Sequence, residues 1–358
     1  MKIGLILLQK WNPMTTLLLP EYSYSSYMKN SQYATYKRVF SGLFISLLFC
    51  LQPISYADTE PLKPLEAPKD LNMLKVKLGE RLFHDVRLSK DNSIACAGCH
   101  NLALGGADNK ALSVGINGGV GGVNSPTVYN SGLLFRQFWD GRAETLADQV
   151  DGPVQEKVEM GSLWPEVVVK LNKDATYSDE FKAIYKKDGD AISRKHIKDA
   201  IAEFERSLVT INSPFDQYLK GDQDAIDDQA KEGYRLFKHY GCASCHQGAN
   251  VGGNMYQVFG VVASYFEKKG KMTAGDKGRF NVTGNPQDMH RFKVPSLRMA
   301  ALTPPYLHDG KAETLRDAVD IMFEHQLGRK APDEDKEAIV HFIKTLVGEH
   351  PALKKEVK

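Results

Sequence analysis

The sequence predicts a mainly α-helical protein made of two tandem halves of similar design. Apolar residues recur at helical spacing in several stretches, whereas strand-like alternation is rare. Short motifs also recur in the same order along the 358 residues, which indicates an internal duplication. Residues 209–222 contain an Asn-Ser-Pro turn and form the best candidate junction. We therefore expect a first domain at residues 58–212 and a second at residues 213–358.

The duplication is clearest in an eight-residue stretch. Residues 139–146 read WDGRAETL and residues 308–315 read HDGKAETL, at a constant offset of 169. The triplet Arg-Leu-Phe also occurs twice, at residues 81–83 and 235–237, ahead of the two cysteine motifs described below. Each half is therefore expected to run from a helix through a cysteine motif, a glycine-rich loop and a turn to a second helix.

Two of the expected helices have clear boundaries. Ser193 is the expected N-cap of a helix with a continuous apolar face. That face consists of Ile197, Ile201, Phe204 and Leu208. A final helix is expected over residues 333–347, because acidic residues occupy its first turn and favour a helix N-terminus.

Residues 1–57 resemble an export signal. Lys37 and Arg38 precede an apolar run at residues 39–51, and a Ser-x-Ala site ends at Ala57. The run is shorter than the roughly 20 residues of a membrane span, although an uncleaved anchor is the alternative interpretation. We expect cleavage near Ala57 and a periplasmic location, and Met28 is a more ordinary start than the first methionine.

The charge of the chain argues against nucleic acid as a partner. The formal net charge is +2, and without residues 1–57 the chain holds 41 basic and 43 acidic residues. Binding to phosphate backbones requires a concentrated basic surface, and no such stretch occurs.

Four of the five cysteines form two similar units. Residues 96–100 read CAGCH and residues 242–246 read CASCH, while Cys50 lies in the presumed signal. C-x-x-C-H is the attachment signature of c-type haem, in which both thiols bond one porphyrin and the histidine ligates its iron. The expected attachment and ligand residues are Cys96, Cys99, His100, Cys242, Cys245 and His246. Each half is thus expected to be a cytochrome c-like domain.

Three other interpretations of these cysteines are weaker. Two C-x-x-C pairs that share a zinc ion are usually about 12–20 residues apart, and here the separation is far larger. A thioredoxin-like dithiol requires a βαβ context, which is not visible. Disulfides between cysteines three residues apart would be strained.

Further stretches resemble the bacterial dihaem cytochrome c peroxidase family, within the wider group that includes the tryptophan-modifying oxidase MauG. The match extends over residues 78–348. Its most specific parts are residues 124–128, 137–142, 295–298 and 303–310. The resemblance implies that the first haem is the peroxide site and that the second haem takes up electrons.

The resemblance also assigns the iron ligands. It places His100 on the peroxidatic iron, and His246 and Met322 on the electron-transfer iron. Histidine–methionine ligation raises the reduction potential and leaves no open position, which suits a relay. Met322 has the alternative interpretation of a core methionine. Its rivals as ligand are Met255, Met272, Met289 and Met299.

Peroxide cleavage requires a proton carrier and a dipole beside the iron. The resemblance assigns these roles to Glu159 and Gln149, and places Trp139 between the two haems. It also implies a calcium ion between the domains, held by Asn124, Thr303 and Pro305. Amide and carbonyl oxygens are ligands that calcium prefers.

One departure from the family pattern concerns the loop after the first haem motif. Many members carry a histidine there that caps the oxidised peroxidatic iron, and the matching position here is Ile116. No histidine occurs between His100 and His196. Since isoleucine cannot ligate iron, we expect an open iron and no need for reductive activation.

The function implied is reduction of hydrogen peroxide to water with electrons from a small periplasmic cytochrome c or cupredoxin. The family is often dimeric, so a homodimer is one expected state. Two alternatives stay open: a MauG-like oxidase that modifies a protein side chain, which an open iron would suit, and a dihaem electron carrier without enzymatic activity.

Overall fold

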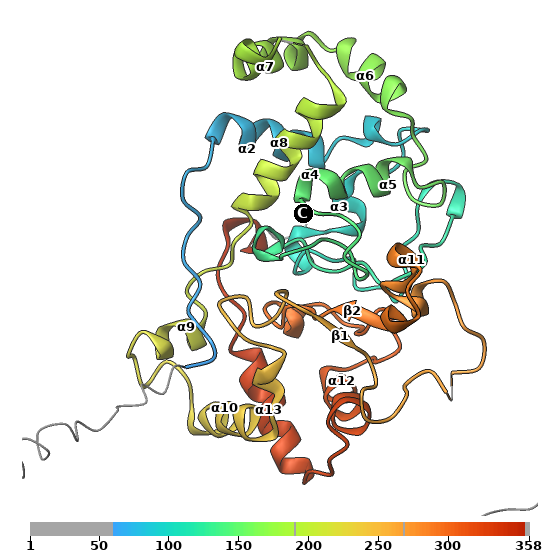
Figure 1. The fold of residues 1–358 in the computed structure, drawn as a ribbon. Coiled ribbons are helices and arrows are strands. Elements are labelled where there is room, and N and C mark those ends of the chain that lie inside the picture. The colour runs from blue at the N-terminus through green and yellow to red at the C-terminus, as the bar shows by residue number, and fades with distance from the viewer. Residues whose placement is uncertain (1–59, 190, 268, 355–358) are drawn as a thin grey trace, which may run out of the picture. The chain divides into compact units, whose positions relative to one another are not determined.

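Two helix pairs organise the part of the chain that the computed structural model describes, which is residues 60–354 without 190 and 268 (Figure 1). In the first half, up to residue 212, α2 (Met73–Phe83) packs on α8 (Arg194–Ser207). In the second half, α10 (Asp228–Tyr240) packs on α13 (Asp333–Lys344). The two pairs lie at opposite ends of the view in Figure 1, with the small sheet between them.

Each helix pair makes its closest contact at a glycine. A Cβ atom built on Gly79 would lie 1.9 Å from the carbonyl oxygen of Ala200, and one on Gly233 would lie 1.9 Å from that of Ala338. Any larger residue would force the helices apart. Both glycines stand two residues before an Arg-Leu-Phe triplet, so the structure repeats the same packing where the sequence repeats.

The turns that follow the glycine-rich loops are also duplicated. The Gln137 N–H donates to the Ala143 carbonyl (2.9 Å), and the Tyr306 N–H donates to the Ala312 carbonyl (2.7 Å), at the predicted offset of 169. A threonine then caps the next helix in each half, α4 (Leu146–Gln149) and α12 (Leu315–Ile321). The predicted internal duplication is confirmed at the level of hydrogen bonds.

The rest of the described chain is also mainly helical, as predicted. A π-helix, Met322–Leu327, continues α12. The strands β1 (Tyr256–Val258) and β2 (Arg291–Lys293) form one antiparallel pair with Tyr256 opposite Lys293. The remaining α-helices are α3 (Cys96–Cys99), α5 (Asp151–Gln155), α6 (Trp164–Asn172), α7 (Ala175–Tyr185), α9 (Pro214–Leu219) and α11 (Phe280–Thr283).

The predicted helix boundaries are close to those observed. Ser193 caps α8 by accepting a hydrogen bond from the His196 N–H, and the predicted apolar face is buried. The last helix begins at Asp333 as predicted but ends at Lys344, three residues early. Beyond the helix, the Glu349 N–H donates to the Ile211 carbonyl (2.7 Å).

Terminal segments of the described chain pack on the opposite half. Leu62 belongs to the core of the second half, and the Leu65 N–H donates to the buried Asp216 carboxylate (3.1 Å). Asp216 also pairs with Arg298 (2.7 Å), and both side chains are fully buried. Conversely, Leu353 packs on a first-half cluster. Each end of the described chain thus packs on the half to which it does not belong in sequence. The division at residue 212 remains a prediction.

The predicted export signal, including Cys50 and the site at Ala57, lies outside the described residues. Among the residues that are described, no helix has the length and apolar character needed to cross a membrane.

Candidate active site

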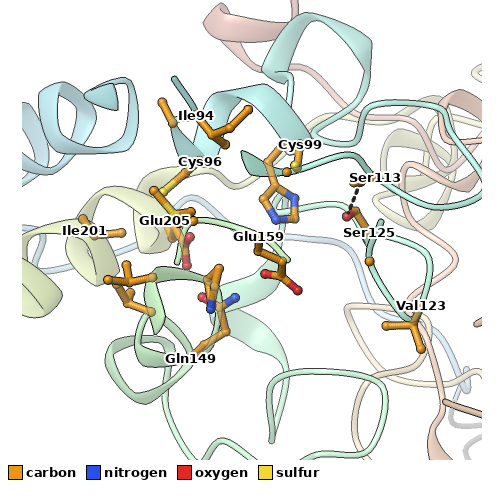
Figure 2. Close-up of a pocket in the computed structure, with 18 residues that line it drawn as sticks. Ile94, Cys96, Cys99, Ser113, Val123, Ser125, Gln149, Glu159, Ile201 and Glu205 are labelled. Carbon is orange, nitrogen blue, oxygen red and sulfur yellow. Dashed lines mark hydrogen bonds between the residues drawn. The ribbon is translucent and has the colours of Figure 1, made fainter. Parts of the chain in front are cut away.

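A pocket opens in the first half beside the first cysteine motif (Figure 2). Its lining includes Cys96, Cys99, His100, Gln149 and Glu159. In Figure 2 the two cysteines lie on one side of this first-half pocket, and Gln149 and Glu159 lie on the other. The structure therefore brings together five of the residues that the sequence assigned to the peroxide site.

The first cysteine motif forms a single turn of helix that orients its histidine. Cys96–Cys99 is α3, and the His100 N–H donates to the Cys96 carbonyl (2.9 Å). The His100 Nδ1 lies 3.3 Å from the Gly106 carbonyl, as expected for a ligand histidine whose other ring nitrogen faces a metal. Burial lowers the pKa of His100, which favours the neutral ring that ligates iron.

The four cysteines have the chemistry that covalent haem attachment requires. All four are free thiols, so the disulfide alternative is not realised. Burial raises the pKa of Cys96 to about 12, which keeps this thiol protonated. Among the described residues, the side chains spaced to hold a metal ion are Asp276, His308 and Asp309, and no cysteine belongs to this cluster.

Glu159 faces the pocket from the loop after α5. Burial raises its pKa, and the nearby Glu156 charge adds to the increase while Arg142 opposes it. A carboxyl with a raised pKa holds a proton more readily than an ordinary glutamate, which suits a proton carrier. Gln149 ends α4 and presents a neutral amide to the same space.

The loop that carries Ile116 packs on the backbone of Glu159. The Ile116 N–H donates to the Glu159 carbonyl (2.8 Å), and the Ile116 side chain is buried. A Cβ on Gly161 would lie 2.4 Å from Ile116 Cδ1, so the isoleucine packs against that turn. Ile116 is not among the residues that line the pocket, whereas its neighbour Gly115 is. The open position on the peroxidatic iron stays a prediction.

The second cysteine motif is built similarly but holds its histidine differently. The His246 N–H donates to the Cys242 carbonyl (3.0 Å). Burial lowers the pKa of His246 to about 4, yet its Nδ1 makes no hydrogen bond of ordinary geometry. A Cβ on Gly252 would lie 3.3 Å from this nitrogen and 2.3 Å from the Pro295 carbonyl oxygen, so only glycine fits beside the ring.

Met322 is the first residue of the π-helix, a form that is frequent at functional sites. The Gln326 side chain in that helix accepts from the Gly260 N–H (3.0 Å) and donates to the Val258 carbonyl (3.0 Å). Gln257, which precedes Val258, lies 4.0 Å from the Cys245 sulfur. The π-helix that begins at Met322 is therefore bonded to a strand that lies beside the second cysteine motif.

The rival methionines are placed differently. Met299 is fully buried in a core cluster of the first half, whereas Met272 is exposed. Met255 and Met289 are half-buried. The assignment of Met322 as ligand stays a prediction.

Trp139 lies where the two halves meet. Its ring is 6.4 Å from that of His308, the equivalent residue of the second half, in an edge-to-face arrangement. Its Nε1–H donates to the Asn124 carbonyl (2.9 Å), while the Asn124 N–H donates to the His308 carbonyl (2.8 Å). The Asn124 side chain donates to Lys110, and its Oδ1 accepts no hydrogen bond from a described residue.

Sequence reasoning missed Glu205, whose side chain also lines the first-half pocket. One signal was present, because Glu205 stands four residues after Ile201 on the apolar face of α8. Sequence reasoning also assigned no role to His308. This side chain is buried, and its Nε2 lies 2.8 Å from the Asp276 carboxylate, which also pairs with Lys269.

The fold is helical and carries two C-x-x-C-H motifs, and the pocket beside the first motif also contains Glu159 and Gln149. These features define a protein of the c-type haem class. Residues 73–224 match the family model described as di-haem cytochrome c peroxidase. The chain is 43% identical to cytochrome c551 peroxidase of Nitrosomonas europaea over 83% of its own length and 87% of that protein. The chain therefore belongs to the di-haem cytochrome c peroxidase family, and this membership implies two haem groups.

Other comparisons agree with this membership. Cytochrome c peroxidase Ccp of Escherichia coli is 45% identical over 81% of this chain, but the chain spans only 61% of that relative's length. A MauG-like protein associated with microbial copper homeostasis has a similar structure, with a TM-score of 0.71 and 27% identity over 82% of this chain and 97% of that one.

Proposed function

We propose that this protein is a dihaem peroxidase of the periplasm that reduces hydrogen peroxide with electrons from a small cytochrome c or cupredoxin. Each turnover would consume one peroxide, two electrons and two protons and would yield two waters. The observation that carries the proposal is that His100, Gln149 and Glu159 line one pocket with a haem-attachment motif. Bound there, the haem would supply an iron that binds peroxide and accepts electrons one at a time.

Glu159 would move the proton within the pocket. Its carboxylate takes a proton from the peroxide oxygen that binds and returns it to the oxygen that leaves. The raised pKa of Glu159 favours its holding the proton between the two steps. The Gln149 amide would donate a hydrogen bond to the oxygen on which charge develops.

Electrons would enter through the second half. His246 and Met322 would ligate its iron, and residues 58–212 and 213–358 would be the two cytochrome c-like domains. Trp139 would bridge them, supported by its contact with the second-half residue at the same repeat position. Calcium would bind at this junction through Asn124, Thr303 and Pro305, and the open Asn124 Oδ1 supports that role. A homodimer remains part of the proposal.

The decisive experiment is steady-state turnover of peroxide by the dihaem holoenzyme, with reduced cytochrome c as donor. A peroxidase oxidises two cytochromes per peroxide. A MauG-like oxidase would react poorly with the cytochrome and hold a long-lived oxidised state, and an electron carrier would exchange electrons without consuming peroxide. Either of the last two results would refute the proposal.

A further inference from the structure

Glu205 is a buried carboxyl group in the wall of the first-half pocket. It stands on α8 and is 6% exposed. In Figure 2 it lies between Cys96 and Gln149, with Ile201 beside it on the same helix. It is thus a second carboxyl group in the lining of this pocket, beside Glu159, and the proposed reaction does not use it.

No described residue satisfies this carboxylate. Neither of its oxygens accepts a hydrogen bond or forms an ion pair, although most buried carboxylates do both. The neighbouring Glu203 differs, since it accepts from the Asn72 N–H (2.7 Å) and pairs with Arg206 (2.7 Å). Burial alone raises the pKa of Glu205 to about 8.

Charged side chains on the helices that pack against α8 form ion pairs or hydrogen bonds of their own. On α2, Lys75 pairs with Asp199 and Arg81 with Glu180. On α4, Asp148 is bonded to Thr145 and lies 3.8 Å from Lys198 of α8. Of the groups that line the pocket, His100 would be a neutral ligand, and Cys96 and Cys99 would be thioethers. Among the protein groups that line the pocket, Glu159 is therefore the other acid that can titrate with Glu205.

We propose that Glu205 takes up a proton when the first haem gains an electron. This inference rests on the proposed function, because it requires a haem in the pocket. With a haem bound there, a one-electron reductant would convert its ferric iron to ferrous, while a solvent proton would form the O–H bond of the Glu205 carboxyl. The pocket then keeps a constant net charge. Such coupling is expected in a poorly solvated site, since an uncompensated negative charge there repels an added electron.

The test is a redox titration of the first haem against pH in the dihaem holoenzyme. In the wild type its potential should fall as pH rises, approaching about 59 mV per pH unit, because a tenfold change in proton concentration is about 59 mV for one electron. Glu205→Gln should lose this slope around pH 8. Glu159→Gln should retain it, and the exposed control Glu334→Gln should match the wild type. A slope that survives in Glu205→Gln, or that disappears only in Glu159→Gln, would overturn the inference.

Direct proton uptake provides a second readout that needs no variant. In weakly buffered solution at about pH 9, above the pKa of Glu205, a pH indicator should record most of one proton taken up per electron delivered to the first haem. No uptake would overturn the inference even if Glu205→Gln failed to fold. If the first half carries no haem, the proposed function itself fails, whereas a haem with a pH-independent potential refutes only the role of Glu205.

Discussion

Replacing Glu159 by glutamine would remove the proton carrier of the pocket and keep its size and polarity. A positioned general acid–base group contributes about 100- to 10,000-fold to rate, so kcat/KM for peroxide should fall by that factor, or about 3–5 kcal/mol. Since the base must be deprotonated, wild-type activity should also decline as pH falls through the pKa of Glu159. Burial places that decline above the ordinary glutamate range.

The neighbouring Glu156 provides the matched control, because it is exposed and contributes only its charge. Glu156→Gln should retain nearly full activity, and its acid limb should move to lower pH because one cause of the raised Glu159 pKa is gone. The assay is kcat/KM for peroxide between pH 4 and 9 with a saturating cytochrome donor. Equal losses in the two variants, or less than a tenfold loss in Glu159→Gln, would refute the assignment.

Three further variants test the fold and the second haem. Gly79→Ala should lower the melting temperature strongly, because its methyl group meets a backbone oxygen, whereas Gly132→Ala, with space for a methyl, should not. Met322→Leu should lower the potential of the second haem and change its low-spin spectrum, while Met299→Leu should leave both unchanged. Asp216→Asn should cost about 3–5 kcal/mol in urea unfolding, because it leaves a buried arginine without its counter-charge, and a loss below 1 kcal/mol would contradict this.

Local features of the fold were readable from the sequence. The helical periodicity, the Ser193 cap and the repeated motifs depend on residues close together in the chain, so the patterns predicted them correctly. The gathering of His100, Gln149 and Glu159 in one pocket was predicted only through the family resemblance. Periodicity alone shows that a helix has an apolar face but not what that face meets.

Long-range features were not readable. The packing of residues 60–65 on the second half depends on Asp216 and Arg298, which are far apart in sequence and meet only after folding. Glu205 was overlooked because a glutamate on a helix is ordinarily a solvated residue. Only the structure reveals that this position faces a pocket and that none of the described residues bonds its carboxylate.

The measurement that tests the account most directly is peroxide turnover by the fully oxidised, calcium-loaded dihaem protein, without prior reduction, together with its EPR spectrum. The account places Ile116 away from the pocket, and it predicts immediate turnover and a high-spin signal from the first haem. Two low-spin haems, with turnover only after pre-reduction, would contradict it, because another group would then cap the iron.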